Sequence, residues 1–404
     1  MSTSLIYHAF GVHGYQYVRT FYKKGKIFYQ IKIHPSQIRC PDCDSRKVIL
    51  KGSKTRQFKT VPIGKKQVIL IASIQRVQCL QCRCVKQVNL GLADAKKSYT
   101  RLFARYVLEL LRFSTIQDVA HHLGVSWDTI KEIQKEYLIK HFSKPRLKNL
   151  THIAIDEISI GKRHKYITLV LDLKSGAVVF IGDGKGADSL EPFWKKLKKS
   201  KAAITAVAMD MSPAYIQAVT TNMPQVGIVF DHFHVIKYFN DKLSDLRRQL
   251  YHQTKERQER QELKGLRWIL LKNPEHLDET KDEKVRLEKA LQANKELAIA
   301  YYLKEDLRQL WKQENKKMAS SHLRAWTAKA RASGITILMK FAKTLAAHQT
   351  GILAYYDYHI STGPLEGTNN KIKTMQRQSY GFRDNEFFKL KILAIHQSRY
   401  ALIG

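Results

Sequence analysis

The chain has 404 residues and carries 70 lysine and arginine residues against 35 acidic residues, a formal net charge of +35. This length exceeds one ordinary domain, and such a charge requires a polyanionic partner: nucleic acid first, an anionic membrane surface as the alternative. No apolar run of about 18 residues exists to span a bilayer, and His8, His13 and Lys23 interrupt any signal-peptide core, so we expect a cytoplasmic protein.

Residues 1–95 are expected to form strands, including runs at 48–50 and 67–75, and a zinc ribbon. All five cysteines lie between residues 40 and 84, unlike the cysteines of a secreted disulfide framework. Two Cys-x-x-Cys pairs would make the tetrahedral four-thiolate site that structural zinc prefers. Cys84 is either a spare thiol or a replacement ligand if Cys82 points away. Five unrelated buried thiols are the alternative, and a redox pair is disfavoured because no thioredoxin-like pattern surrounds either pair. The predicted zinc ligands are Cys40, Cys43, Cys79 and Cys82.

Residues 96–145 are expected to form a helix-turn-helix DNA-binding domain. Within it, Ser114 or Thr115 can cap a first helix, Gly124 supplies the tight turn and Ser126 can cap a second helix. The second helix would present its exposed side chains to a DNA groove. An ordinary helical hairpin is the alternative, which the basic composition and the neighbouring cysteine pairs disfavour. The predicted DNA-binding residues are Trp127, Asp128, Thr129, Lys131 and Lys135.

Residues 146–234 alternate between strand and helix patterns. We expect strands over 151–160, 166–173, 177–182, 204–210 and 225–231, and helices over 188–199 and 213–222. Three consecutive strands, then helix, strand, helix and strand, is the order of the ribonuclease-H-like fold, in which strands one and four are neighbours. The chain is therefore predicted to be a multidomain α+β protein with a ribonuclease-H-like α/β catalytic core, whose first part these residues form.

Two aspartates lie on the first and fourth of these expected strands. Asp156 breaks the apolar alternation of residues 153–160, and a carboxylate inside a central strand is costly unless it is paired or metal-bound. Asp210 closes the fourth strand, where open α/β sheets place their ligands. The two side chains should face each other. The alternative is that both are ordinary surface carboxylates.

A third carboxylate is expected in residues 356–404, which would complete the core with C-terminal helices. Ser361 or Thr362 can cap a helix there, and Pro364 suits its first turn. Glu366 would share one helical face with an amide and two cations, a combination that suits a metal site beside a phosphate backbone. A solvated helix face is the alternative. The residues predicted to share that face are Asn370, Lys373 and Arg377.

Three such carboxylates can hold two Mg²⁺ or Mn²⁺ ions about 4 Å apart, the arrangement that phosphodiester chemistry needs. Residues 235–355 carry only helical patterns, and a compact core needs far fewer residues there, so we expect an all-helical insertion. Its Trp268, Trp311 and Trp326 are candidates to stack on an unpaired base, although core packing is the commoner role for each.

At these motifs the sequence resembles the insertion-sequence transposases of the ISL-three type, which join a zinc ribbon, a helix-turn-helix and a DDE ribonuclease-H-like core. The resemblance covers nearly the whole chain in the right order. Besides the cysteine pairs, the matching segments are residues 124–130 (Gly-Val-Ser-Trp-Asp-Thr-Ile), 155–157 (Ile-Asp-Glu), 210–215 (Asp-Met-Ser-Pro-Ala-Tyr), 229–236 (Val-Phe-Asp-His-Phe-His-Val-Ile) and 363–373 (Gly-Pro-Leu-Glu-Gly-Thr-Asn-Asn-Lys-Ile-Lys).

The resemblance implies that Asp156, Asp210 and Glu366 form the catalytic triad and bind magnesium. It also implies binding to double-stranded terminal inverted repeats and target DNA, phosphodiester hydrolysis and strand transfer, and an insertion that contacts the element's end. It further implies a homodimer on DNA, in the bacterial cytoplasm and nucleoid-associated when bound. Asp231 and His234 match a motif whose role would be to support the site, as would Asn370, Lys373 and Arg377.

Several alternatives stay open at this point. Asp231 also closes a strand and could replace Asp210 as the second catalytic acid, although the fourth strand borders the first in the expected fold. His232 and His234 could be ordinary core or capping histidines. For the whole chain, the alternatives are a non-catalytic zinc and helix-turn-helix regulator, or a ribonuclease-H-like nuclease or resolvase. The regulator would not need a carboxylate triad, and the nuclease would not need two N-terminal DNA-binding modules.

Overall fold

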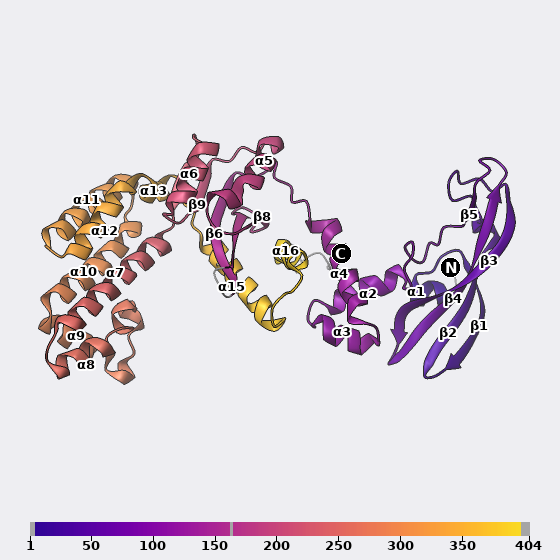
Figure 1. Cartoon of the computed structure of the whole chain (residues 1–404), viewed down its shortest axis with the longest axis horizontal. Helices are drawn as coiled ribbons and strands as arrows, with labels where there is room; N and C mark the ends of the chain where they lie inside the picture. Colours follow the sequence, from indigo (N-terminus) through magenta and orange to yellow (C-terminus); the bar gives the residue numbers. More distant parts are fainter. Residues whose placement is uncertain (1–4, 162–164, 397–404) are drawn as a thin grey trace. The chain divides into compact units, whose positions relative to one another are not determined.

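A computed structural model describes residues 5–161 and 165–396 (Figure 1). The chain forms two compact units, divided between Ser143 and Lys144, and each unit is described by itself. The first unit holds the cysteines and the expected helix-turn-helix, and the second holds the acidic residues of the expected active site. Among the described residues, no helix combines the length and the apolar character that crossing a membrane requires.

A five-stranded sheet organises the first unit. Its strands are β1 (Tyr15–Lys23), β2 (Lys26–Ile33), β3 (Val48–Ile63), β4 (Lys66–Cys79) and β5 (Val85–Gln87), in the order β1-β2-β4-β3 with β5 paired to β4. The short helix α1 (Leu5–Phe10) packs Ile6 and Phe10 into the core of this sheet. The chain then passes through a 3-10 turn, η1 (Pro35–Gln37), to the first cysteine pair.

The β3–β4 hairpin is longer than the sequence predicts. Residues 51–55 of β3 are exposed, so they carry no apolar alternation that would mark a strand. They extend because their backbone pairs with the more apolar β4, from Ser53 opposite Gln75 to Thr60 opposite Val68. The pairing partner, which the local sequence does not reveal, therefore decides the length of β3.

Three helices complete the first unit: α2 (Arg101–Leu110), α3 (Ile116–Leu123) and α4 (Trp127–Phe142). Thr115 and Asp118 form a capping box at the start of α3, and Ser126 caps α4 as predicted. Gly124, between the two helices, has φ +58°, a left-handed conformation that favours glycine. The expected helix-turn-helix geometry is therefore present.

The second unit contains the expected α/β sheet. Its strands are β6 (His152–Gly161), β7 (Lys165–Asp172), β8 (Val178–Asp183), β9 (Ala206–Met209) and β10 (Gly227–Phe230), in the order β10-β9-β6-β7-β8. Strands one and four of this core, β6 and β9, are parallel neighbours as predicted. The order matches the ribonuclease-H-like arrangement.

Helices cover both faces of this sheet. One face packs against α5 (Glu191–Ser200), which follows the 3-10 turn η2 (Ala187–Leu190), and against α6 (Pro213–Asn222). The other face carries Ala154, Ile158 and Ala208, which pack against α15 (Gly363–Gln378) and α16 (Asn385–Leu393). Because strand side chains alternate between faces, Asp156 and Asp210 belong to the face covered by α15.

Between β10 and α15 the described chain is helical. The 22-residue helix α7 (His232–Gln253) follows β10 directly. The remaining helices are α8 (Arg257–Gly265), α9 (Glu283–Ala293), α10 (Lys295–Arg308), α11 (Lys316–Ala332), α12 (Thr336–Ala347), α13 (Gln349–Leu353) and α14 (Tyr355–Tyr358), with 3-10 turns η3 (Ile269–Leu271), η4 (Pro274–His276), η5 (Glu279–Lys281) and η6 (Gln309–Lys312).

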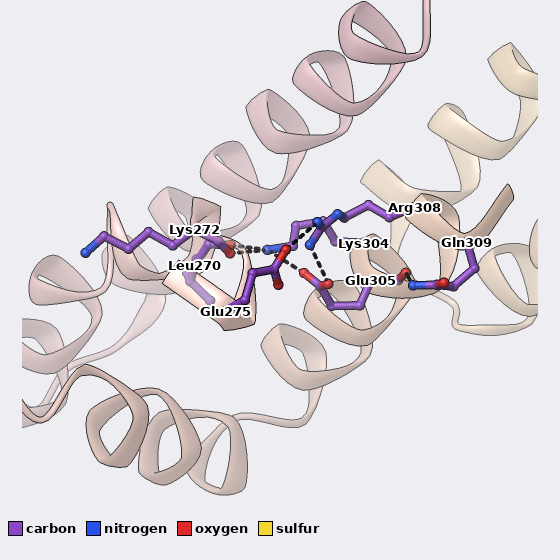
Figure 2. A network of polar contacts seen from close by, with 7 residues as sticks. All are labelled: Leu270, Lys272, Glu275, Lys304, Glu305, Arg308 and Gln309. Atoms are coloured by element: carbon purple, nitrogen blue, oxygen red, sulfur yellow. Dashed lines mark hydrogen bonds and ion pairs between the residues drawn. The ribbon is translucent and has the colours of Figure 1, made fainter. Parts of the chain in front are cut away.

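A buried lysine holds the irregular segment between α8 and α9 against α10. The Lys304 ammonium donates to the carbonyls of Leu270 (2.8 Å) and Lys272 (3.0 Å) and pairs with Glu305 (2.9 Å), as Figure 2 shows. Arg308 extends the network by bridging Glu305 and Glu275. Lys304 is 1 % exposed, so its charge is compensated by these acceptors.

The three tryptophans of this segment differ in exposure. Trp326 is fully buried and donates its indole N–H to the Leu303 carbonyl, so it is a core residue. Trp311 is half-buried against the same core. Trp268 is 65 % exposed, and the guanidinium of Arg267 stacks over its ring. Of the three, Trp268 is the most exposed and so the most accessible to another molecule.

Candidate active site and zinc centre

Three aspartates lie at corresponding positions on three adjacent parallel strands. Ala154 of β6 pairs with Ala208 of β9, so Asp156 and Asp210 stand at the same level two residues further on. Met209 of β9 pairs with Phe230 of β10, which brings Asp231 level with Asp210. The carboxyl ends of parallel strands are where such sheets gather their functional groups.

Asp156 is held by two N–H donors. Its Oδ1 accepts from the backbone N–H of Glu157 (2.8 Å), and its Oδ2 accepts from Nδ2 of Asn369 on α15 (2.9 Å). Burial raises the pKa of Asp156, and the charge of Asp210 adds to the increase. Without a bound cation, ionisation of Asp156 is therefore unfavourable. A cation beside the carboxylate would lower the free energy of its ionised form.

Asp210 is more open than the other two aspartates. It is half-buried, and its Oδ1 accepts from the backbone N–H of Ser212 (3.1 Å). No hydrogen bond to its other oxygen arises from any residue that the structure describes. One oxygen of Asp210 is thus fixed in orientation, and the other remains available to a ligand.

Asp231 is buried and surrounded by protein partners. It is 2 % exposed, and it accepts from the backbone N–H of Thr362 (3.3 Å) and contacts Nδ1 of His234 (3.3 Å) and of His232 (3.5 Å). Burial raises the pKa of Asp231, but these contacts outweigh burial, and the net effect lowers it. The same contact with Asp231 raises the pKa of His234.

Glu366 lies in the first turn of α15 and is exposed. Asn370, Lys373 and Arg377 are exposed too, whereas Leu365 and Ile372 are buried against the sheet. Thr362 occupies the N-cap position but its side chain does not cap, and Ser361 Oγ accepts from Gly363 N–H instead.

The structure does not draw Glu366 into one tight cluster with Asp156 and Asp210. A compact metal site needs at least three ligand atoms that all lie within 4.8 Å of one another. Over residues 5–161 and 165–396, only cysteine side chains meet this condition. Ligands of a two-ion site can lie farther apart than this, because the ions themselves stand about 4 Å apart.

Two contacts around Asp156 escaped the sequence interpretation. Asn369, not its neighbour Asn370, reaches Asp156; the apolar phase of α15, with Leu365 and Ile372 inward, would have placed Asn369 on the buried side. On the opposite face of β6, Glu157 accepts from the Tyr215 hydroxyl (3.1 Å). No pattern in the sequence links Glu157 with Tyr215, because the contact depends on how α6 packs.

The two cysteine pairs converge. The Sγ atoms of Cys40, Cys43, Cys79 and Cys82 all lie within 4.8 Å of one another. Cys40 and Cys82 are 3.5 Å apart, as are Cys43 and Cys79. Backbone N–H groups of Cys43 and Asp42 lower the pKa of Cys40 to about 6, which favours a thiolate. Four thiols in this geometry fit a structural zinc ion.

The predicted DNA-binding residues lie in the first turns of α4. Trp127 is 42 % exposed and the Lys131 ammonium lies 5.2 Å from the centre of its ring. Asp128 is exposed, and Lys135 is half-buried further along the helix. Thr129 is engaged in the cap, since its N–H and hydroxyl both contact Ser126. Trp127 and Asp128 are therefore the most accessible of the five predicted residues.

Three family models match the chain in the same order as the three modules. Residues 36–82 match the zinc finger of the transposases of IS204, IS1001, IS1096 and IS1165, and residues 88–138 match the helix-turn-helix domain of transposase family ISL3. Residues 153–392 match the DDE transposase model of the same family.

Curated transposases and one solved structure are similar to this chain. The transposase for insertion sequence element IS1001 of Bordetella parapertussis is 33 % identical over 358 residues, 88 % of each chain. The transposase for IS1557 of Mycobacterium tuberculosis is 28 % identical over 381 residues, 88 % of this chain and 84 % of the relative. The Drosophila P element transposase in its strand transfer complex aligns with a TM-score of 0.39 at 11 % identity, over 74 % of this chain and 92 % of the other. The chain belongs to the ISL3 family of insertion-sequence transposases.

Proposed function

We propose that the protein is a DNA transposase that binds the terminal inverted repeats of its insertion sequence and cuts and joins DNA there. Its catalytic residues are Asp156, Asp210 and Glu366. The observation that carries the proposal is the pair of carboxylates at the same level of two adjacent parallel strands: Asp156 within β6, buried and with a raised pKa, and Asp210 just after β9. Such a pair stabilises cations, and cations are what phosphodiester cleavage needs.

Two Mg²⁺ or Mn²⁺ ions, when bound, would activate the attacking oxygen and neutralise the leaving oxygen. The chain's own residues prepare the site. Asn369 and the Glu157 N–H fix both oxygens of Asp156, while Asp210 keeps one oxygen available. Glu366 completes the triad from the exposed face of α15.

Asp210 is a better second acid than Asp231. The carboxylate of Asp231 already has the Thr362 N–H and two histidine rings around it, and a metal ion would have to displace them. Asp231 and His234 therefore support the site: Asp231 ties the start of α15 to the end of β10. Lys373 and Arg377, on the same exposed stripe as Glu366 and Asn370, are proposed to contact DNA phosphates.

The modules divide the work. We assign residues 1–95 to the zinc ribbon and 96–145 to the helix-turn-helix, with α4 reading the element's end. Residues 146–234 and 356–404 form the catalytic core, and residues 235–355 form the helical insertion, with Trp268 available to contact DNA. The protein is proposed to act as a homodimer, because a transposon has two ends to be joined.

The test uses purified protein, a duplex carrying the element's end, and Mg²⁺. Asp156→Asn, Asp210→Asn and Glu366→Gln should each abolish the appearance of 3′-OH ends while end binding in a gel shift stays nearly intact, because an amide keeps the shape but loses the charge that holds the ions. Asp231→Asn should be less severe.

Two outcomes would change the assignment. If Asp210→Asn cuts normally while Asp231→Asn is inactive, then Asp231 is the second acid. If all four variants cut as well as the wild-type protein, these residues are not catalytic, and end binding without cleavage would identify a regulator.

A further inference from the structure

The fifth cysteine stands as close to the zinc site as the predicted ligands stand to each other. Cys84 Sγ lies 3.3 Å from Cys40 Sγ and 3.4 Å from Cys82 Sγ. Two thiolates on one tetrahedral zinc ion are separated by roughly 3.8 Å, given zinc–sulfur bonds of about 2.3 Å. Cys84 is therefore at ligand spacing from two of the four predicted ligands, although it lies beyond residues 36–82, the segment that matches the zinc-finger model.

The backbone holds Cys82 and Cys84 on one turn. Arg83, between them, has φ +59°, a left-handed conformation that non-glycine residues seldom adopt. The Cys79 N–H donates to the Cys84 carbonyl (2.9 Å), which fixes the return of the chain toward the knuckle. Cys40 and Cys79 are buried, whereas Cys82 is exposed and Cys84 half-buried. The exposed edge of the site thus carries two thiols beside Cys40.

We propose that Cys84 is an alternative zinc ligand that exchanges with Cys82. As the bond from zinc to the Cys84 sulfur forms, the bond to the Cys82 sulfur breaks, and the Cys84 thiol proton passes to the leaving Cys82 thiolate. The number of thiolates, the net charge and the zinc ion are unchanged. In this proposal the ion stays bound through Cys40, Cys43 and Cys79. Cys84 stands outside the group of four thiols that all lie within 4.8 Å of one another, so its side chain turns inward as that of Cys82 turns out.

The first test compares the zinc content of full-length variants after dialysis against a chelator. Wild type, Cys84→Ser and Cys82→Ser should each keep about one zinc per chain, and Cys82→Ser/Cys84→Ser should lose it. Cys43→Ser is the matched control, because it removes an exposed knuckle thiol that lies 3.5 Å from Cys79, on the other side of the site from the Cys40–Cys82–Cys84 contacts. It should lose zinc although Cys84 is intact.

The proposal is overturned if Cys82→Ser loses zinc as completely as Cys43→Ser does. It rests on zinc binding itself, and zinc-free wild-type protein would overturn both the zinc assignment and the exchange; zinc in the wild type but not in Cys82→Ser overturns the exchange alone.

A second test needs no variant. Limited alkylation of the zinc-loaded wild-type protein should modify one thiol per molecule, with the label divided between Cys82 and Cys84. Trypsin cleaves after Arg83 and so separates the two labelled sites for mass spectrometry. Label confined to Cys84 would show a bystander thiol and overturn the exchange, whatever the folding of the serine variants.

Discussion

At the scale of single residues, Asn369 is the side chain that fixes Asp156. Residues that orient a metal ligand typically change metal affinity or activity 10- to 100-fold when removed. Asn369→Ala should therefore raise the Mg²⁺ concentration for half-maximal cleavage about tenfold, since Asp156 Oδ2 loses its donor. Titration of cleavage with Mg²⁺ measures the shift.

Asn370→Ala supplies the control for that experiment. Asn370 is the next residue on α15, but it lies on the exposed face. Its loss should weaken DNA binding slightly and leave the Mg²⁺ requirement unchanged. Equal Mg²⁺ shifts in the two variants would show that general loosening of α15, and not orientation of Asp156, is responsible.

Asp156 should make the stability of the metal-free protein depend on pH. Because its pKa is raised in the folded state, the folded protein holds this proton more tightly than the unfolded chain does. The resulting stabilisation is complete below the unfolded pKa, near 4, and is lost as pH rises through the folded value. At neutral pH the buried charge therefore opposes folding.

Asp156→Asn should raise the melting temperature of the protein in EDTA at neutral pH. The new amide can be accommodated. Oδ1 of Asn369 is buried and has no hydrogen-bond partner among the described residues, so the Asn369 amide can turn and accept a hydrogen bond from the side-chain N–H of the substituted residue. Mg²⁺ should then raise the melting temperature of the wild type but not of the variant. An equal response to Mg²⁺ in both proteins would remove Asp156 from the metal site.

The sequence could predict the aspartates but not their partners. Asp156 and Asp210 are marked by their positions in apolar strands, and a charge there demands an explanation. Asn369 and Asn370 are adjacent and differ only in the face of α15 on which they lie. The polar stripe that includes Glu366 and Asn370 drew the prediction to the exposed face and away from Asn369. The contact between Thr362 and Asp231 joins residues far apart in the chain, and no local pattern encodes it.

At the scale of elements, the turn of the helix-turn-helix is fastened to the β3–β4 hairpin. Gln67 Nε2 donates to the carbonyls of Leu123 (3.0 Å) and Gly124 (3.2 Å). On the far side of α4, the Lys97 ammonium pairs with Glu132 and Glu136. The buried hydroxyl of Thr100 donates to that of Thr60. These contacts fasten the helices to the sheet of the first unit, so we expect this unit to bind DNA as one body.

A double-mutant cycle of Gly124 and Gln67 tests this junction, and the sign of the interaction free energy between the two substitutions can be predicted. Gly124→Ala should destabilise the protein by about 1–2 kcal/mol, because alanine disfavours the left-handed backbone at this position. A second cost comes from a clash, since the new Cβ would lie 1.9 Å from Gln67 Nε2. Gln67→Ala removes that clash. The double variant should therefore be more stable than the sum of the single effects, by thermal unfolding of the full chain. Strict additivity would show that Gln67 does not press on the turn.

The elements that sequence reasoning located best are those with their own signals. Thr115, Gly124 and Ser126 mark the ends of α3 and α4 by capping chemistry, and the five core strands are marked by apolar runs. β3 is the exception: its exposed residues became a strand because β4 lies beside them. Strand length there is a property of the pair.

At the scale of the whole molecule, the net charge of +35 should dominate the salt dependence of DNA binding. Each neutralised phosphate releases counterions, and a protein with roughly six to ten phosphate contacts loses about 10³- to 10⁵-fold in affinity between 50 and 200 mM salt. End binding should fall within this range in a salt titration. Lys373→Gln should lower the slope by about one, whereas Asp210→Asn should not lower it. A slope near zero would exclude phosphate contacts as the source of affinity.

The first turn of α7 has a mechanical consequence. Asp231 ends the sheet, begins the longest helix of the helical segment and accepts a hydrogen bond from the residue that starts α15. Asp231 is the single residue between β10 and α7, and it is hydrogen-bonded directly to the N-cap residue of α15. A displacement of the first turn of α7 would move Asp231 and, through its hydrogen bond with Thr362, the first turn of α15, where Glu366 lies. Asp231 therefore links the start of α7 to the turn of α15 that carries Glu366, the glutamate proposed to be catalytic.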